Sequence, residues 1–259
     1  MSQNRREQLR KAEQAKANQQ RLTRIIGVGA GLLVVVIVAV FAVVLISQAN
    51  KAATTAPSAG QVTPPHALAD NLGIRPYPNA TPQAGAPVVE LFFDYQCPIC
   101  NQFETIYGAS LEKLASAGQI DLHYRPMIFL DVNLQNDASL RAGVAAACAD
   151  TVGKYREYHD QIFANQPQQE GAGYADSLLR DTLPTKVGLS GDTLTSFQKC
   201  YDGKLTQNWV QAQEDAGEKA GVTGTPTFKV NGKDVPLKDF SNVSPDQLGE
   251  LIKKVQSEQ

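Results

Sequence analysis

The hydrophobic positions of the chain divide it into three regions. Residues 25–46 form an apolar run without a charged side chain, residues 47–85 are rich in Ala, Pro, Thr and Gly, and beyond residue 86 apolar residues recur at strand and helix spacing. As a helix, the 22 residues of the run span about 33 Å, enough to cross a hydrocarbon core of about 30 Å. The pattern therefore predicts a transmembrane helix at 25–46, a linker at 47–85 and a folded domain at 86–259.

A buried core helix or a cleavable signal peptide is the alternative interpretation of residues 25–46. We favour the membrane span because the run is longer than the apolar region of a usual signal peptide and follows a long polar leader. Cleavage among the small residues 49–53 would release the domain, and the sequence leaves this alternative open.

The charges on either side of the apolar run predict its orientation. The leader, residues 1–24, holds seven Lys/Arg and two Glu, whereas Lys51 is the one basic residue in the stretch that directly follows the run. Positive charge stays on the cytoplasmic side, so we expect a cytoplasmic leader and an extracytoplasmic linker and domain. A basic leader could also bind nucleic acid, but topology alone accounts for it. The rest of the chain keeps 17 Lys/Arg and 24 Asp/Glu and has no basic footprint for nucleic acid.

Within the domain the apolar pattern changes from strand to helix. PVVELFFD (87–94) is a near-continuous apolar run, typical of a buried strand. Helical spacing follows as far as Gly118, and residues 119–128 alternate as a second strand, which predicts a right-handed β-α-β unit. Helical patterns then cover 137–166, 174–187, 192–202 and 205–220.

The C-terminal part returns to strands. Strand patterns at 225–230 and 233–237 flank Asn231-Gly232, a turn signal, and therefore predict a hairpin. Residues 244–255 predict a helix that Ser244 caps, with Gln247 completing a capping box. The fold class is α/β, in the order βαβ, helices, ββα.

Two cysteines, Cys97 and Cys100, lie at the start of the first predicted helix. Exposed N–H groups and the positive end of the helix dipole stabilise a thiolate there, and the pKa of Cys97 could fall from about 8.5 to between roughly 3.5 and 7.5. Cys100, one turn later, is expected to be more buried and to close a disulfide. Pro98 suits the first helical turn because it lacks an N–H.

This pair is compatible with three kinds of site. A structural staple closes a very small loop and removes little unfolded-state entropy. A zinc site needs a second pair of ligands, which the sequence does not offer at ligand spacing. A redox-active dithiol is therefore favoured. The three histidines, His66, His123 and His159, lack the spacing of a Cys-His hydrolase dyad and are expected to be structural or exposed to solvent.

Cys148 and Cys200 lie 52 residues apart in the predicted helical block. A disulfide between them would close a large loop, worth on the order of 4 kcal/mol in lost chain entropy. We expect a structural disulfide, with a second redox pair or free core thiols as alternatives.

Two stretches resemble the DsbA-like thiol-disulfide oxidoreductases, which have a thioredoxin fold with a helical insertion. FFDYQCPIC (92–100) is similar to that family's active-site signature, and GVTGTPTFKVNG (221–232) to the segment around its cis-proline. The resemblance covers about 87–257 and implies a helical insertion at about 132–220. It also implies that Pro226 is the cis-proline, that Thr225 presents backbone to an extended substrate, and that Pro98 and Ile99 shape the site.

The resemblance leaves the proton carrier open. Many relatives have a buried glutamate six residues before the first cysteine, where this chain has Leu91. Glu90 is one residue earlier, which on a strand points to the opposite face. Asp94 matches an acidic position of many relatives. Either carboxylate could carry a proton or could be solvated at the end of the strand.

Together these features predict a membrane-anchored, extracytoplasmic, monomeric protein thiol-disulfide oxidoreductase. An oxidase is favoured over a reductase or isomerase, because residues 47–85 are too short and polar for the dimerisation domain of such isomerases. The expected partners are reduced or unfolded exported proteins and, as the family implies, a quinone-linked membrane protein that reoxidises the pair. We expect no cofactor beyond the disulfide and no metal. A metal- or ligand-carrying thioredoxin-like protein is the alternative from another class.

Overall fold

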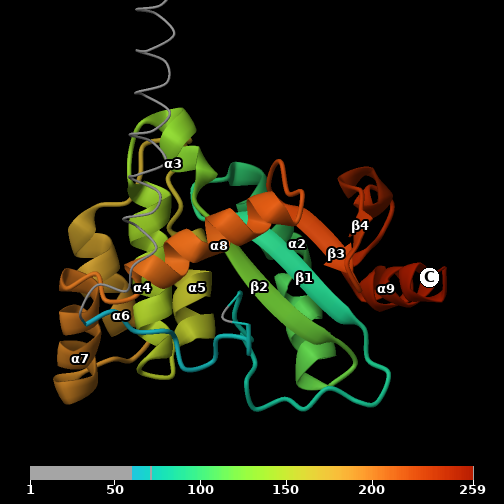
Figure 1. Ribbon diagram of the computed structural model, residues 1–259, viewed down its shortest axis with the longest axis horizontal. Helices are drawn as coiled ribbons and strands as arrows, with labels where there is room; N and C mark the ends of the chain where they lie inside the picture. Colours follow the sequence, from blue (N-terminus) through green and yellow to red (C-terminus); the bar gives the residue numbers. More distant parts are fainter. Residues whose placement is uncertain (1–59, 71, 259) are drawn as a thin grey trace, which may run out of the picture. The chain divides into compact units, whose positions relative to one another are not determined.

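A four-stranded sheet forms around the strand that precedes the cysteine pair, in the order β2-β1-β3-β4 (Figure 1). Strand β1 is parallel to β2 and antiparallel to β3, and β3 is antiparallel to β4. The parallel pair confirms the β-α-β unit, and the antiparallel pair confirms the hairpin. The strands are β1 (Val88–Asp94), β2 (Asp121–Met127), β3 (Thr227–Val230) and β4 (Lys233–Val235).

The computed structural model describes residues 60–70 and 72–258. The predicted leader and transmembrane helix lie outside these residues, so both stay predictions. Within the described ranges, no helix combines the length and the apolar character that crossing a membrane requires.

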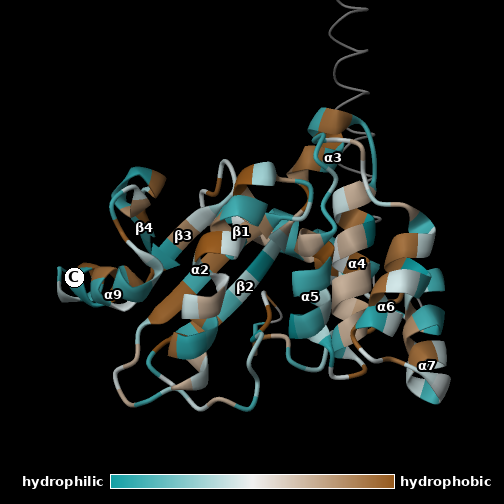
Figure 2. Ribbon diagram, turned by 180° about the vertical axis from the view of Figure 1, so that it is seen from behind, coloured by the Kyte–Doolittle hydropathy of each residue, from teal (hydrophilic) through white to brown (hydrophobic). Residues whose placement is uncertain are grey.

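Helices cover both faces of the sheet. Helix α8 (Gln207–Lys219) crosses the face turned to the viewer in Figure 1, and α2 (Pro98–Ser116) lies on the other face, which Figure 2 shows. Helix α9 (Leu248–Ser257) packs against α2. A 3-10 turn with the expected Ser244–Gln247 capping box precedes α9. The sheet is therefore shielded by helices, as the apolar sequence of β1 requires.

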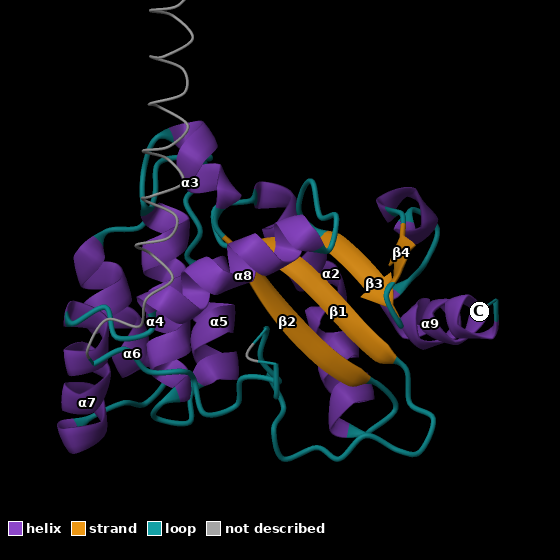
Figure 3. Cartoon of the chain, viewed as in Figure 1, coloured by secondary structure: helices purple, strands orange, loops and turns teal. Residues whose placement is uncertain are grey.

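The remaining helices form a block beside the sheet (Figure 3). Helix α4 is its centre, and its alanines are buried, which lets neighbouring helices approach closely. The predicted segment 137–166 is divided after α4, where Gly153 adopts a left-handed φ of 70°. The block contains α3 (Phe129–Leu134), α4 (Ala138–Asp150), α5 (Tyr155–Ala164), a π-helical turn (Leu178–Thr182), α6 (Leu183–Lys186) and α7 (Gly191–Asp202).

A disulfide joins Cys148 on α4 to Cys200 on α7, with their Cα atoms 5.7 Å apart. Both residues are buried in the helical block. The predicted structural disulfide is confirmed, and it ties two helices that 52 residues separate.

Residues 60–70 and 72–80, which the sequence predicted as linker, instead pack against the domain; we call them the N-terminal strap. Ile74 is fully buried, and its backbone N–H and C=O pair with the backbone of Tyr124 on β2 at 2.9 Å. The N–H of Val62 donates to the carbonyl of Leu205 at 2.7 Å. Low apolar periodicity suggested a linker, but one isoleucine in the core and a backbone bridge are enough to hold the strap.

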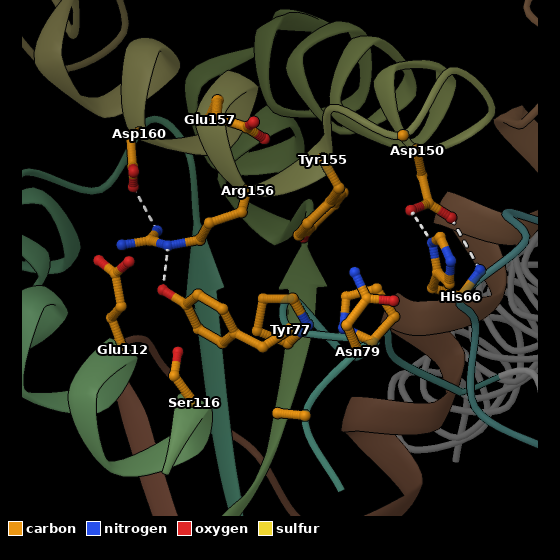
Figure 4. A pocket seen from close by; sticks show the side chains of 14 residues that line it. His66, Tyr77, Asn79, Glu112, Ser116, Asp150, Tyr155, Arg156, Glu157 and Asp160 are labelled. Carbon is orange, nitrogen blue, oxygen red and sulfur yellow. Dashed lines mark hydrogen bonds and ion pairs between the residues drawn. The ribbon is translucent and has the colours of Figure 1, made fainter. Parts of the chain in front are cut away.

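A polar cavity of about 540 Å³ lies between the strap and helices α2 and α5 (Figure 4). Arg156 reaches across it and binds both the hydroxyl of Tyr77 and the carboxylate of Asp160. His66 donates its backbone N–H to Asp150 at 2.9 Å, and its ring Nδ1 lies 2.7 Å from the same carboxylate. These contacts fasten the strap to α4 and α5.

Candidate active site

Cys97 occupies the N-cap of α2, directly after β1. Its N–H donates to the carbonyl of Asp94 at 3.0 Å, and its Sγ accepts the N–H of Cys100 at 3.3 Å. Pro98 is in the first turn of the helix, as expected. Both cysteines are free thiols and buried, with 6% and 1% of their surfaces exposed. The end of the strand and the start of the helix thus fix both sulfurs.

The two thiols have opposite acidities. The pKa of Cys97 falls to about 6, chiefly because the Cys100 thiol donates to its sulfur; burial opposes this effect, and the N–H of Cys100 adds to it. The pKa of Cys100 rises well above its usual value, first because of burial and then because the Cys97 thiolate is close. At neutral pH the reduced pair is therefore a Cys97 thiolate beside a Cys100 thiol, the state suited to nucleophilic exchange.

The segment before β3 closes the other side of the pair. The Thr225–Pro226 peptide bond is cis, and the Cys97 thiol lies 3.5 Å from the carbonyl oxygen of Thr225. Ile99, between the two cysteines, is 54% exposed. The structure thus brings Thr225 next to the cysteine pair, although it lies 128 residues after Cys97 in the sequence.

Asp94 lies at the end of β1 with its side chain fully buried. Its Oδ1 accepts the hydroxyl of Ser139 at 2.6 Å and the N–H of Gln96 at 2.8 Å, and its Oδ2 accepts the N–H of Leu130 at 3.3 Å. Burial raises its pKa to about 7, although these three donors oppose the rise. The backbone of Asp94 also hydrogen-bonds Cys100. A carboxyl that titrates near neutrality therefore belongs to a residue whose backbone contacts the buried cysteine.

Glu90 is placed differently. Its Oε1 accepts from Nε of Arg125 at 2.8 Å and lies 2.6 Å from Nη2 of the same residue. The Glu90 carboxylate, four residues before Asp94, is therefore engaged in an ion pair with Arg125 on the neighbouring strand β2. Of the two candidate proton carriers, the geometry favours Asp94.

Sequence patterns did not identify a polar cluster between the active-site loop and the helical block. Gln96 Nε2 donates to side-chain oxygens of Asp131, Asn136 and Ser139 at 2.8–2.9 Å. In the other direction, Asn136 Nδ2 donates to Gln96 Oε1 at 3.0 Å. These partners lie 35 to 43 residues after Gln96, so no local motif marks them. The glutamine within the cysteine signature was the one available signal.

Further polar side chains of the helical block hold the loop backbone. Gln166 Nε2 donates to the carbonyls of Tyr95 and Cys97 at 2.8 and 3.0 Å, and the hydroxyl of Tyr174 also donates to Tyr95. On the far side of the loop, the Tyr95 hydroxyl lies 3.0 Å from Nδ1 of His159, which is fully buried among aromatic rings. The helical insertion therefore positions the cysteines.

Comparisons with known proteins agree with this geometry. The Thioredoxin family model matches residues 82–254. Disulfide bond formation protein D of Bacillus subtilis is 26% identical over 172 residues, which are 65% of this chain and 72% of that protein. Thiol:disulfide interchange protein DsbA of Pseudomonas syringae is 28% identical over 56% of this chain and 62% of its own length, so less than two thirds of that relative is covered.

A solved structure gives the same fold. MdbA, a thiol-disulfide oxidoreductase from Actinomyces oris, superposes with a TM-score of 0.55 at 24% identity, over 66% of this chain and 81% of that chain. The family match covers about two thirds of the sequence and includes Cys97, Cys100 and Pro226. The chain therefore belongs to the thioredoxin family, as a DsbA-like thiol-disulfide oxidoreductase.

Proposed function

We propose that the protein is a membrane-anchored extracytoplasmic dithiol oxidase that introduces disulfides into exported proteins. The observation that carries this proposal is the position of Cys97 at the N-cap of α2, where the N–H of Cys100 lies 3.3 Å from its Sγ and its pKa falls to about 6, whereas burial raises the pKa of Cys100. A stabilised Cys97 thiolate favours the reduced pair, and so makes its disulfide a stronger oxidant.

The reaction transfers two electrons from two substrate thiols to the Cys97–Cys100 disulfide. A substrate thiolate attacks Cys97 Sγ, the bond between the two cysteines breaks, and Cys100 leaves as a thiolate that takes up a proton. A second substrate thiolate then attacks the substrate sulfur of the mixed disulfide, and Cys97 leaves as a stable thiolate. The backbone of Thr225, 3.5 Å from Cys97, would pair with an extended substrate, and Pro98, Ile99 and Pro226 would shape its surroundings.

Asp94 is our candidate for the proton donor to Cys100. Three features support this role: its buried carboxyl, its pKa of about 7 and the contact of its backbone with Cys100. A general acid works best when its pKa is close to the working pH. Glu90, already bound by Arg125, is the weaker candidate.

The strap supports the oxidase over the isomerase. Isomerases of this kind need a separate dimerisation domain, whereas residues 60–70 and 72–80 fold back on the domain through Ile74 and His66. The protein would then act as a monomer, tethered by residues 25–46, and a quinone-linked membrane protein would restore its disulfide.

Equilibration of the protein with glutathione redox buffers tests the direction of electron flow. An oxidase should have a potential well above the roughly −270 mV of thioredoxin and should oxidise reduced, unfolded ribonuclease. Cys97→Ser serves as the inactive control. A potential near that of thioredoxin, with no ribonuclease oxidation, would refute the oxidase.

Protease treatment of intact cells and of inverted membrane vesicles tests the anchoring. The domain should be digested in intact cells and protected in inverted vesicles, and it should remain with the membrane after a high-salt wash. A domain released by salt, or protected in intact cells, would refute the proposed topology.

A further inference from the structure

We propose that Gln166 and Tyr174 are positioning residues that set the redox potential of the cysteine pair by holding two backbone carbonyls of the active-site loop. This loop is formed by residues 95–97, between β1 and α2. The role rests on the redox function of the pair and deepens the proposed function, because it names side chains outside the cysteine motif that fix how strongly the pair oxidises.

The carbonyl of Tyr95 lacks the partner that a turn would give it. A turn pairs a carbonyl with the N–H of the residue three positions later, but here that residue is Pro98, which has no N–H. In the part of the chain that the structure describes, the donors to this oxygen are two side chains of the helical block. A buried carbonyl without a partner costs free energy, so the loop depends on these donors.

The side-chain amide of Gln166 spans the loop. Its Nε2 lies 2.8 Å from the carbonyl oxygen of Tyr95 and 3.0 Å from that of Cys97, so its two N–H groups can each serve one carbonyl. The Cys97 oxygen also accepts the N–H of Asn101 at 3.2 Å, the bond that opens α2. Gln166 therefore ties the backbone before the first cysteine to the first turn of the helix.

Tyr174 completes what we call the carbonyl clamp, the pair Gln166 and Tyr174. Its buried hydroxyl donates to the carbonyl of Tyr95 at 2.5 Å. Burial raises the pKa of Tyr174, so the hydroxyl stays protonated and remains a donor at neutral pH. Arg141 on α4 donates from Nη1 to the backbone carbonyl of Tyr174 at 3.0 Å, which fixes the position of this tyrosine.

The carbonyl clamp acts on the Cys97 thiolate through the orientation of the loop. Cys97 has an extended backbone, with φ −74° and ψ 116°, and its sulfur accepts the N–H of Cys100 at 3.3 Å. Rotation of the adjoining peptide units would weaken this contact and turn partly negative carbonyl oxygens toward the sulfur. The charged thiolate exists only in the reduced pair, so the clamp stabilises the reduced form more than the disulfide and makes the pair more oxidising.

The N–H groups of the loop are held separately from its carbonyls. The N–H of Gln96 donates to Asp94 Oδ1 at 2.8 Å, and the N–H of Cys97 donates to the carbonyl of Asp94 at 3.0 Å. Both bonds are independent of the helical block. Variants of the clamp should therefore fold with the loop still attached to the end of β1.

The test is the equilibrium of the full chain with glutathione redox buffers at pH 7, together with thiolate titration of Cys97 in the reduced form. Tyr174→Phe removes one hydroxyl and keeps the ring, and it should lower the equilibrium constant for oxidising glutathione about threefold. Gln166→Met removes two hydrogen bonds and should lower it about tenfold, which corresponds to about 30 mV. In both variants the pKa of Cys97 should rise.

Gln166→Glu adds a readout that depends on charge. A carboxylate accepts hydrogen bonds but does not donate them, and its charge would repel both the carbonyls and the thiolate. At pH 7 the glutathione constant should therefore fall further than in Gln166→Met. The difference between these two variants should shrink as the pH is lowered toward about 4, where a glutamate becomes protonated.

Tyr158→Phe is the matched control. The buried hydroxyl of Tyr158 donates to the carbonyl of Leu179, which belongs to the helical block and not to the active-site loop. Its loss should lower the free energy of unfolding, measured by urea denaturation, about as much as Tyr174→Phe does. The glutathione constant should stay unchanged.

Two outcomes would overturn the role of the carbonyl clamp. Unchanged glutathione constants in Tyr174→Phe and Gln166→Met would show that the clamp only supports the fold. An equal fall in Tyr158→Phe would show that any loosening of the helical block has the same effect. Both outcomes are differences from the unaltered protein, so they are distinct from failure of the proposed oxidase, which the potential of the unaltered protein decides.

Discussion

The two cysteines of the active site differ through their surroundings. Cys97 caps a helix and accepts hydrogen bonds, whereas Cys100 is deeper and donates one. Each thiol therefore depends on the other for its acidity, and a change at one position should be visible at the other.

Replacing Cys100 by alanine should raise the pKa of Cys97, because the largest stabilising contact of its thiolate is lost. Thiolate absorbance near 240 nm should titrate close to pH 6 in the reduced protein, and above about pH 7 in Cys100→Ala. Cys148 and Cys200 form a disulfide and add no thiolate signal. An unchanged midpoint would show that the helix N-terminus alone sets the acidity of Cys97.

Folding raises the pKa of Asp94 from 3.8 to about 7, so the folded state binds the proton more tightly than the unfolded state does. The resulting stabilisation is complete below pH 3.8 and is lost as the pH rises toward 7. At 1.36 kcal/mol per pH unit, the loss reaches at most about 4 kcal/mol.

Asp94→Asn should therefore remove a decline in the free energy of unfolding between about pH 4 and 7. Urea denaturation of the oxidised protein, in which Cys97 cannot titrate, gives the difference between the variant and the unaltered chain at each pH. Two parallel pH profiles would mean that Asp94 titrates normally in the folded protein.

Sequence patterns predicted those site residues that a local motif carries. Cys97 and Cys100 could be found because their spacing and their place between a strand and a helix define them, whereas the Thr225–Pro226 pair was predicted only through the resemblance to the DsbA-like family. Gln96, Ser139 and Asp131 could not, because their roles depend on contacts across the boundary between sheet and insertion. Strand alternation correctly separated the faces of Glu90 and Leu91 but did not show that Arg125 binds Glu90.

At the scale of elements, α4 and α8 pack closely at Gly143. A Cβ at this glycine would lie 2.8 Å from Cγ1 of Val210, which is fully buried. Valine has one strongly preferred rotamer in a helix and cannot easily move aside. At Gly217 on α8, by contrast, an added Cβ would meet the flexible end of Met127.

Gly143→Ala should destabilise the domain by about 1–3 kcal/mol, even though alanine is the better helix former. Gly217→Ala is the matched comparison and should cost less, because a methionine repacks more readily. Val210→Ala should suppress the effect of Gly143→Ala in a double-mutant cycle measured by urea denaturation. Additive effects would show that the two side chains do not clash.

The disulfide between α4 and α7 closes a 52-residue loop. Replacing both Cys148 and Cys200 by alanine should lower the free energy of unfolding by about 4 kcal/mol, because the unfolded chain gains entropy. Urea denaturation measures this loss, and thiolate titration of Cys97 provides the control, since the site should be unaffected. A loss of less than about 1 kcal/mol would indicate a bridge that strains the folded helices.

The order of elements was predicted because long periodic segments mark it, and the insertion at 132–220 agrees with helices from Phe129 to Lys219. The break at Gly153 was missed because apolar residues continue on both sides of it. The strap was missed because its attachment depends on one isoleucine and scattered polar contacts, which produce no periodicity.

For the molecule as a whole, the folded domain begins earlier in the sequence than the family match, which starts at residue 82, because the strap packs against it. Ile74→Ala should cost about 2–4 kcal/mol, since it removes a fully buried side chain. Val62→Ala, at a position 40% exposed, is the matched control and should change stability by less than about 0.5 kcal/mol. Thermal unfolding of both variants tests this; equal, small effects would mean that the strap is dispensable.

Ile74 also closes one side of the sheet. Its backbone bridge to Tyr124 occupies part of the outer edge of β2. At the opposite side, β4 has three residues, of which Lys233 and Asp234 are exposed. The unpaired N–H and C=O groups of an exposed edge strand can pair with another extended chain and so start aggregation. Under the proposed function the protein would meet unfolded polypeptides at high local concentration, and a covered edge and a short charged one would then limit its co-aggregation with them.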